Sequence, residues 1–410
     1  MDKKVIIIVA VVAVVIVAAA AVLLLNNKGG GDDDVKGLSI ISRVNSEGSG
    51  IILSQSEDPS SYITVQTTKP AADAKYIKND STGNYYVFNV AGWGGKVFAT
   101  PGAATIQHVQ LMELASLMGL KYASYSDGTT TKADTLYYVA GVPSFAEFVN
   151  KEKTSPVCGF IIWEAQVSVA TGNGYNLLAL TNDLFDGHTC CIIGASNKYL
   201  NKETEAIETF LSVYAKSVDA INAAIANPTS SAYSELLSIS LKRVSMPDGD
   251  YDKEKAVKEA LANVLYLYAD DAKGGLSSLE SDIAKLAEDL YDAHQINNSA
   301  KDLGFTSYAA LADKFVDNSY LSEALKGGHD KLDSKKTINV AVIGGDIHQI
   351  AIWYAYDKGM FDDANLNVVI SSQSNGPAVY GLLANGETDI GFLGAPPMTI
   401  RSMNAGDIHA

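Results

Sequence analysis

The sequence predicts an α/β fold in which parallel-dominated sheets are covered by helices. Strand-like and helix-like segments alternate with short connections from residue 338 onward. Short apolar runs rich in β-branched residues occur at 157–163 and 189–194, and amphipathic helical patterns dominate 202–325. Such alternation is typical of parallel sheets, because each crossover helix packs on a sheet face.

The composition of the 410 residues excludes several classes of protein. A hydrophobic content of 47% with 9% aromatic residues supplies a core, which excludes wholesale disorder. The net charge of −16 argues against nucleic-acid binding. Three cysteines are too few for a disulfide framework, and the adjacent Cys190 and Cys191 are expected on opposite faces of a strand.

Residues 1–28 predict an N-terminal membrane anchor. Val5 to Leu25 carries no charged or polar side chain and, as a helix, would span about 30 Å, the thickness of a bilayer core. Lys3 and Lys4 precede this run and a Gly/Asp tether at 29–36 follows it, so the bulk of the chain is expected outside the cell membrane. A cleaved signal peptide is the alternative, although its apolar region is usually shorter, about 7–15 residues.

The first half of the chain is expected to be mainly strands and turns. β-rich runs at 38–41 and 51–53 flank a small-residue segment, and the polar region 54–84 reads as irregular. Strands are predicted at 85–90, 96–100, 157–163 and 189–194. Pro101-Gly102 ends the second of these strands, and a helix follows from about 104 to 118, ending at Gly119.

The second half is expected to begin as helices and to end as an alternating unit. Helices are predicted at 204–226, 253–268, 276–293, 308–316 and 320–325, followed by a polar linker at 327–336. Strands at 338–343, 367–370 and 389–393 then alternate with helices at 347–358 and 377–385. A last helix starts at Pro396-Pro397 and reaches about residue 403.

Several segments near the end of the chain resemble one protein family as an ordered set. They are Ile338-Asn339-Val340-Ala341-Val342, 355–361 (Ala-Tyr-Asp-Lys-Gly-Met-Phe), 366–368, 383–394 and 404–406. In this order and spacing they resemble the first lobe of the ABC-transporter substrate-binding proteins for nitrate, taurine and aliphatic sulfonates. That family also includes pyrimidine-precursor binders and synthases. The resemblance implies a type II periplasmic-binding-protein-like fold with two hinged lobes.

Other segments resemble the rest of that fold, but they come earlier in this chain than in the usual order of the family. Residues 96–108 resemble the entry into the second lobe, 158–164 a strand ending in Trp-Glu, and 316–321 the usual C-terminal region. The order implies a circular permutation joined through 327–336, which requires old termini that lie close together. The organisation is then a first-lobe strand and hinge crossing at 37–84, a second lobe at 85–188, a return to the first lobe with the helical part at 189–326, and the first lobe again at 337–410. The alternative is a truncated tandem array, in which strand 338–343 would not join the sheet of strand 38–41.

Ligand contacts are expected where helices begin after strands, because helix N-termini present unpaired N–H groups. In the first lobe the candidates are Gly345, Asp346, His348, Gln349, Ser374, Asn375, Gly376, Gly394, Ala395 and Pro396. In the second lobe they are Pro101, Gly102, Ala103, Thr105, His108, Trp163 and Glu164, with Asn45, Glu47 and Gly48 at the crossing between lobes. Ordinary helix capping by Thr105, Asn375 or Asp346, and a core role for Trp163, remain open alternatives.

The resemblance implies an extracytoplasmic solute-binding subunit of an ABC importer, which delivers a small anionic ligand such as a sulfonate or nitrate to a permease. The expected partners are that ligand, the permease and ATPase subunits, and the membrane; the soluble domain is expected to be monomeric. The chain has no His-Glu-x-x-His, Gly-x-Ser-x-Gly or phosphate-loop motif, so no enzyme activity, cofactor or metal is expected. A thiamine-pyrimidine-precursor binder or synthase of the same fold is the alternative, although the synthase branch has a cysteine-rich iron site that three cysteines do not reproduce.

Overall fold

The computed structural model describes residues 37–185, 187–269 and 278–408. The predicted anchor and the Gly/Asp tether fall within residues 1–36 and therefore lie outside the described part. Within the described ranges, no helix is both long enough and apolar enough to span a membrane.

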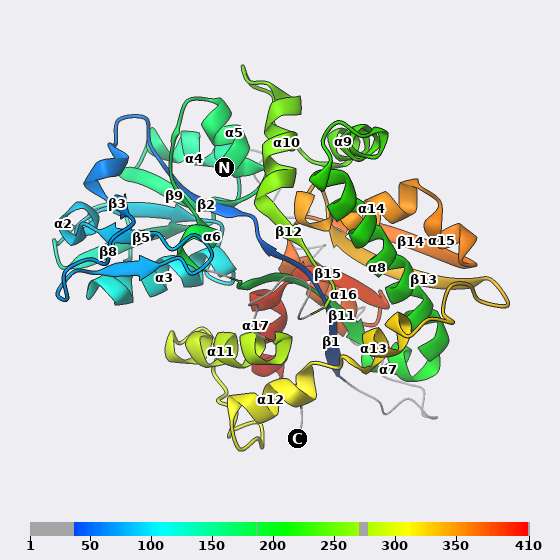
Figure 1. Cartoon of the computed structure of the whole chain (residues 1–410). Helices are drawn as coiled ribbons and strands as arrows, with labels where there is room; N and C mark the ends of the chain where they lie inside the picture. The colour runs from blue at the N-terminus through cyan, green and yellow to red at the C-terminus, as the bar shows by residue number, and fades with distance from the viewer. Residues whose placement is uncertain (1–36, 186, 270–277, 409–410) are drawn as a thin grey trace, which may run out of the picture. The chain divides into compact units, whose positions relative to one another are not determined.

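The α/β prediction is confirmed: the chain forms two six-stranded sheets with helices packed on them (Figure 1). Sheet A has the order β12 (Val264–Tyr266), β1 (Leu38–Glu47), β11 (Thr189–Ser196), β15 (Ile390–Gly394), β13 (Lys336–Ile343), β14 (Leu366–Gln373). Sheet B has the order β10 (Asn176–Leu180), β2 (Ser49–Leu53), β9 (Val157–Trp163), β6 (Val97–Thr100), β8 (Thr135–Ala140), β7 (Lys121–Ser124).

Both sheets are mixed: parallel pairs outnumber antiparallel pairs in sheet B, as predicted, but not in sheet A, where the prediction of a parallel-dominated sheet is wrong. In sheet A, β13 pairs in parallel with β14 and β15, whereas β1 is antiparallel to β11 and β12, and β11 is antiparallel to β15. In sheet B, β6, β7, β8 and β9 are parallel, whereas β2 is antiparallel to β9 and β10. The antiparallel half of each sheet surrounds β1 or β2, the two strands that carry the chain from one sheet to the other.

Helices cover both faces of sheet A, and the sheet with these helices is called lobe A. One face packs against α7 (Asn197–Lys202), α8 (Thr204–Ala226), α9 (Ser231–Arg243), α10 (Lys253–Asn263), η2 (Ile347–Gln349), α14 (Ile350–Asp357) and α15 (Met360–Asp363). The other packs against α11 (Leu279–Asp292), α12 (Tyr308–Phe315), α16 (Gly376–Ala384) and α17 (Ala395–Ala405). The short α13 (Ser319–Leu325) packs on α8. The predicted helix 253–268 is too long, because residues 264–266 pair with β1 as β12.

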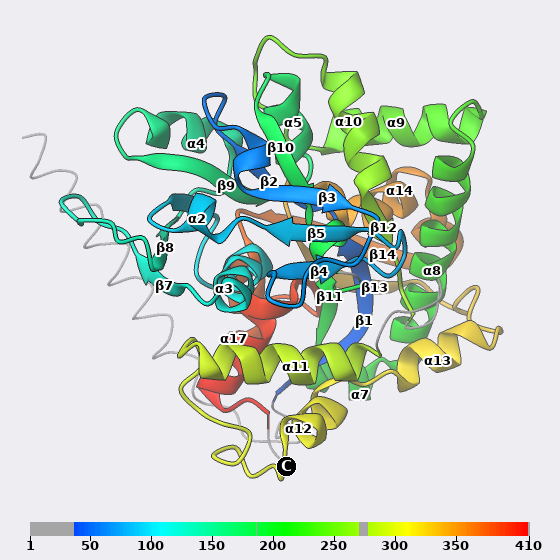
Figure 2. The same cartoon turned by 60° about the vertical axis from the view of Figure 1, so that its left-hand side comes forward.

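Sheet B and its helices form lobe B. The helices are α2 (Val90–Trp93), α3 (Ile106–Met118), α4 (Phe145–Glu152), α5 (Gln166–Gly172) and α6 (Thr181–Leu184). The prediction of an irregular region at 54–84 is wrong in part, because it contains η1 (Pro59–Ser61), β3 (Ile63–Gln66) and β4 (Tyr76–Lys78). Both strands pair with β5 (Tyr85–Phe88) in a three-stranded sheet (Figure 2). This sheet is anchored by Tyr62, whose ring lies edge-on to Trp93 at 5.5 Å.

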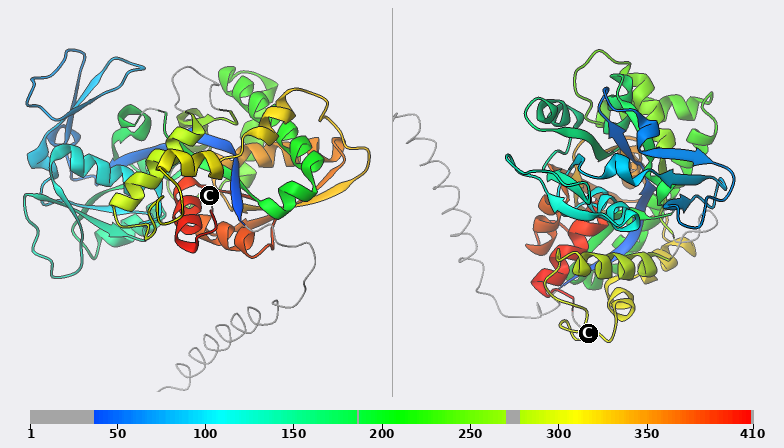
Figure 3. Two further views of the ribbon diagram at one scale, coloured as in Figure 1. Left: turned by 90° about the horizontal axis from the view of Figure 1, so that it is seen from below. Right: turned by 90° about the vertical axis from the view of Figure 1, so that its left-hand side faces the viewer.

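The chain crosses between the lobes at two places. Gly48, with φ of +85°, separates β1 in sheet A from β2 in sheet B. The chain returns after α6 and enters sheet A at β11, so the lobes lie side by side with both crossings between them (Figure 3). The linker before β13 is docked on lobe A, because the Leu332 N–H donates to the Ala364 carbonyl at 3.1 Å.

Candidate functional site

A cavity of about 370 Å³ is lined by residues from both lobes. Its wall in lobe B is the loop before α3, together with Pro143 and Trp163. Its wall in lobe A comes from the loops after β13, β14 and β15 and from the start of β11. The predicted site residues that line it are Pro101, Gly102, Ala103, Thr105, Trp163, Asp346, His348, Ser374, Asn375, Gly376, Gly394 and Pro396.

The start of α3 forms the lobe B side of the cavity. Thr105 is the N-cap: its hydroxyl donates to the Gly102 carbonyl at 2.7 Å and accepts from the His108 N–H at 3.4 Å. The hydroxyl therefore serves its own backbone, as the capping alternative proposed. What this element offers a ligand is the N–H groups of the first helical turn other than that of His108, which Thr105 accepts.

The starts of α16 and α17 form the lobe A side. Asn375 caps α16 by accepting from the Ala378 N–H at 2.9 Å, and Gly394 is the N-cap position of α17. A Cβ at Gly376 would lie 2.9 Å from Cγ of Pro397, so this glycine allows the two helix starts to approach each other.

Three helix N-termini, from α3, α16 and α17, thus meet at one cavity. Each carries a partial positive charge of about half an elementary charge. Of the described residues that line the cavity, none is lysine or arginine. The favourable potential for an anion comes from backbone dipoles instead.

An Asp346–His348 pair lies at the edge of the cavity. Nδ1 of His348 is 2.7 Å from Oδ1 of Asp346, and Nε2 is 3.0 Å from the Gly48 carbonyl oxygen. Burial lowers the pKa of His348, but the Asp346 carboxylate outweighs burial and the pKa rises to about 9. His348 is therefore charged at neutral pH, with both N–H groups donated to protein atoms. It ties the loop after β13 to the crossing between the lobes.

Three predicted residues of lobe A stabilise the fold outside the cavity. The Gln349 side chain donates to the Phe392 carbonyl at 3.1 Å and accepts from the Ile343 N–H at 2.8 Å. The Gly345 carbonyl accepts from the Ser245 N–H at 2.9 Å, and Ala395 is fully buried in the first turn of α17.

The predicted residues His108 and Glu164 of lobe B are also absent from the cavity lining. His108 is buried with its ring edge-on to the stacked rings of Tyr122 and Tyr138, and burial lowers its pKa to about 4. Glu164 is buried, which raises its pKa, and it accepts from the Ser168 N–H and the Asn263 amide.

Of the predicted crossing residues that the structure describes, none lines the cavity; Gly48 contacts both lobes, whereas Asn45 makes a hydrogen bond within sheet A. The Asn45 side chain accepts from the Cys191 N–H at 3.2 Å. The Gly48 carbonyl accepts from the Glu164 N–H at 2.8 Å as well as from His348. Glu47 is the last residue of β1, and its side chain lies outside the description.

Sequence reasoning missed the part of the cavity wall that consists of Ala104, Ile106, Gln107, Pro143, Cys190, Cys191, Ile343, Pro377 and Pro397. The expectation for the two cysteines is wrong, because their sulfur atoms lie only 3.9 Å apart. From Asn45 to Ser46 the pairing advances one residue on β1 but two on β11, from Cys191 to Thr189. Cys190 is thus the extra residue of a β-bulge, and a bulge redirects side chains. The adjacent cysteines were visible in the sequence, but the bulge was not.

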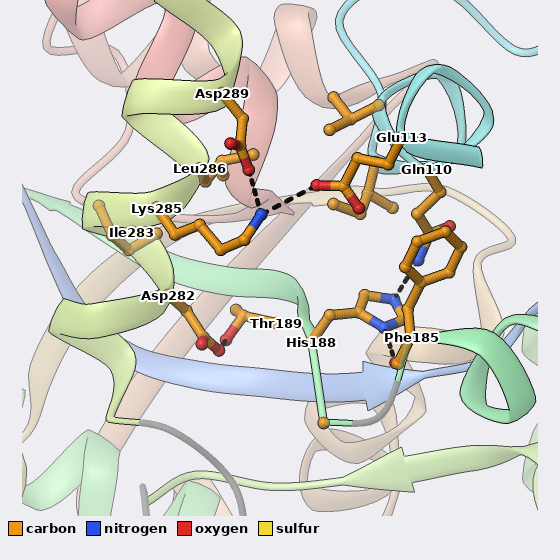
Figure 4. Close-up of a pocket in the computed structure, with 13 residues that line it drawn as sticks. Gln110, Glu113, Phe185, His188, Thr189, Asp282, Ile283, Lys285, Leu286 and Asp289 are labelled. Atoms are coloured by element: carbon orange, nitrogen blue, oxygen red, sulfur yellow. Dashed lines mark hydrogen bonds and ion pairs between the residues drawn. The ribbon is translucent and has the colours of Figure 1, made fainter. Parts of the chain in front are cut away.

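A second cavity, of about 240 Å³, lies between α3, α11, Phe185 and residues 187–189 (Figure 4). Lys285 of lobe A points toward Glu113 of lobe B, at 3.0 Å between Nζ and Oε1, and also contacts Asp289. Across the cavity, the Gln110 amide nitrogen is 3.0 Å from Nε2 of His188. Burial raises the pKa of Glu113, and the Lys285 ammonium opposes this effect. Side-chain contacts within the chain cross this cavity and link the two lobes.

Comparison of the chain with family models, with curated proteins and with solved structures gives no match.

Proposed function

We propose that this chain is an extracytoplasmic solute-binding protein of an ABC importer, held at the membrane by residues 5–25. It binds a small anion between lobe A and lobe B and presents it to a permease. The observation that carries the proposal is the convergence of three helix N-termini, from two lobes, on one cavity of about 370 Å³.

The cavity favours a singly charged ligand. Three helix N-termini together supply roughly one and a half positive charges. The only other charged side chains in the lining, Asp346 and His348, neutralise each other. A sulfonate or nitrate group matches this charge and can accept N–H bonds from the starts of α3 and α16, whereas Pro396 and Pro397 leave α17 to contribute mainly its dipole. The net charge of −16 provides no long-range attraction for an anion, so capture depends on these local donors.

Binding is coupled to lobe closure in this proposal. The lobes share two chain crossings and face each other across the cavity, so a rotation about the crossings changes the distance between α3 and the starts of α16 and α17. A ligand that contacts both lobes at once can do so only in the closed arrangement, and these extra contacts shift the population toward that arrangement.

The proposal includes a circularly permuted type II periplasmic-binding-protein-like fold. Its support is that β13, near the end of the chain, and β1, near the start of the described part, belong to the same sheet. The docked linker before β13 is compatible with a join between old termini. A truncated tandem array would instead leave β13 to β15 as a unit apart from β1.

The test is a thermal-shift titration of the full chain with taurine, alkanesulfonates and nitrate, with thiamine-pyrimidine precursors and amino acids as the competing classes. A ligand at a hundred times its Kd stabilises the folded state by about 2.7 kcal/mol. We expect this for a sulfonate or nitrate only. Stabilisation by none of these anions, or conversion of a tested compound into product, would contradict the proposal.

A matched pair of variants locates the binding site. Ala103 is half-buried and lines the cavity at the start of α3. Ala103→Glu adds a negative charge there, whereas Ala103→Gln adds a side chain of similar size without charge. We expect Ala103→Glu to lose anion binding by at least ten times more than Ala103→Gln, which is about 1.4 kcal/mol. Equal losses would place the anion elsewhere.

A further inference from the structure

The cavity wall contains a pair of thiols that the proposed anion binding does not use. Cys190 and Cys191 lie at the start of β11 and both line the cavity. Their sulfur atoms are 3.9 Å apart, and both cysteines are free. The β-bulge at Cys190 explains this geometry, because adjacent residues of a regular strand would point to opposite faces.

The surroundings of the pair make one thiol more acidic than the other. The hydrogen bond from Cys191 lowers the pKa of Cys190, and the positive charge of His348 lowers it further, whereas burial and the Asp346 carboxylate oppose this effect. The pKa of Cys191 is raised well above its usual value by the Cys190 sulfur and by burial. Cys190 is therefore the more acidic thiol of the pair, and the thiolate is the nucleophilic form of cysteine.

The backbone holds the pair in place. The Cys191 N–H donates to the Asn45 side chain at 3.2 Å, and β11 lies between β1 and β15 in the middle of sheet A. Two sulfur donors fixed on a central strand bind a shared atom with little loss of conformational entropy, which is the advantage of a preorganised chelating site.

We propose that Cys190 and Cys191 form a dithiol site for trivalent arsenic, presented either as arsenous acid or as a monosubstituted arsenoxide. Sulfur donors select soft, thiophilic centres. Adjacent cysteines with close sulfur atoms fit the narrow angle between two bonds at pyramidal arsenic. They do not fit a linear mercury(II) dithiolate, in which the two sulfur atoms lie on opposite sides of the metal.

The binding step balances without an oxidant or a reductant. Two sulfur–arsenic bonds form. With an arsenoxide, the arsenic–oxygen double bond breaks and the oxygen leaves as one water with the two thiol protons. With arsenous acid, two arsenic–hydroxyl bonds break and two waters leave, each carrying one thiol proton. Arsenic stays trivalent throughout.

This site does not depend on the proposed transport role, because the adduct is measured on the protein itself. The two proposals meet at one point: arsenic on Cys190 and Cys191 occupies the cavity wall and should block anion binding there. If no anion stabilises the chain but the adduct forms, the transport proposal fails and the dithiol site stands.

The experiment uses phenylarsine oxide and the full chain, with the adduct read by mass spectrometry under native conditions. We expect one phenylarsenic group per chain, removed by 2,3-dimercaptopropanol but retained in glutathione at the same thiol concentration. Cys190→Ser and Cys191→Ser should each abolish this glutathione-resistant adduct. Cys158→Ser is the matched control and should keep it, because Cys158 lies in sheet B and donates to the Val97 carbonyl.

A second measurement needs no variant. The wild-type chain is loaded with phenylarsine oxide, unfolded and alkylated, and its peptides are mapped. Protection of Cys190 and Cys191 with alkylation of Cys158 supports the site. An adduct that survives in either serine variant, that glutathione removes, or that maps to Cys158 would overturn the proposal.

Discussion

Replacement of Gly48 by alanine tests whether the contact between the lobes is built around this glycine. The residue has φ of +85°, and an added Cβ would lie 2.5 Å from Nε2 of His348 and 2.7 Å from Cγ2 of Val264. A positive φ costs a non-glycine residue about 1–2 kcal/mol. Displacing His348 also breaks its hydrogen bond to the Gly48 carbonyl, and a bond to a charged group contributes about 1.5–3 kcal/mol. We expect Gly48→Ala to lower the free energy of unfolding by about 2.5–5 kcal/mol.

Gly141 provides the control, because it has nearly the same backbone conformation without the contacts. Its φ is +86°, and no described heavy atom lies within 4 Å of an added Cβ. Gly141→Ala should therefore cost only the conformational part, about 1–2 kcal/mol. Urea unfolding of the two variants and the wild type at pH 7 gives both values. If Gly48→Ala is no more destabilising than Gly141→Ala, the argument that His348 and Val264 enclose Gly48 is wrong.

Three further predictions concern other contacts. His348→Gln removes the charged partner of Asp346 and should cost about 3–5 kcal/mol near pH 6. The pKa of His348 in the folded state is raised to about 9, so the stability contributed by its charge is complete below the pKa of the unfolded state and is lost as pH rises through 9. The urea midpoints of variant and wild type should therefore converge above pH 9. A gap between the midpoints that stays constant with pH would contradict this prediction. A double-mutant cycle of Glu113→Gln and Lys285→Met should show a coupling energy of about 0.2–1 kcal/mol, because the Lys285 side chain is 67% exposed. A coupling energy of zero would mean that this ion pair does not link the lobes. Phe210→Ala should lower the free energy of unfolding in urea by about 3–5 kcal/mol, because the buried ring stacks on Phe361 at 5.2 Å. Tyr356 is 44% exposed, so Tyr356→Ala should lower it far less; equal losses would refute the packing argument.

Local signals predicted the elements that depend on local chemistry. The strand predicted at 157–163 matches β9, because a short apolar run rich in β-branched residues was sufficient. The predicted end of α3 at Gly119 is confirmed, since this residue is the C-cap with φ of 72°. The helix N-termini at the cavity were predicted for the same reason: caps and first-turn prolines are read within a few residues.

The failures involve residues whose conformation is decided far away in the sequence. Val264 to Tyr266 continue a helical pattern, but pairing with Asn45 to Glu47 makes them a strand. The buried Gln349 was predicted as a ligand contact, yet its partners, Ile343 and Phe392, satisfy it within the fold. The bulge that brings the two cysteines together depends on the register between β1 and β11, which no local pattern encodes.

The distribution of the two sheets along the chain has a consequence for synthesis on the ribosome. All strands of sheet B come from residues 49–180, so lobe B can fold as soon as this stretch has emerged. Sheet A takes strands from 38–47, 189–196, 264–266 and 336–394, so β1 emerges first but gains its whole sheet only after β15 has been made. Pairing over such separations is slow, because the intervening loops must close first. β1 can pair with β11 and β12 by residue 266, but β11 keeps an open edge until β15 has been made. During that interval the nascent chain is most exposed to aggregation and most dependent on chaperones.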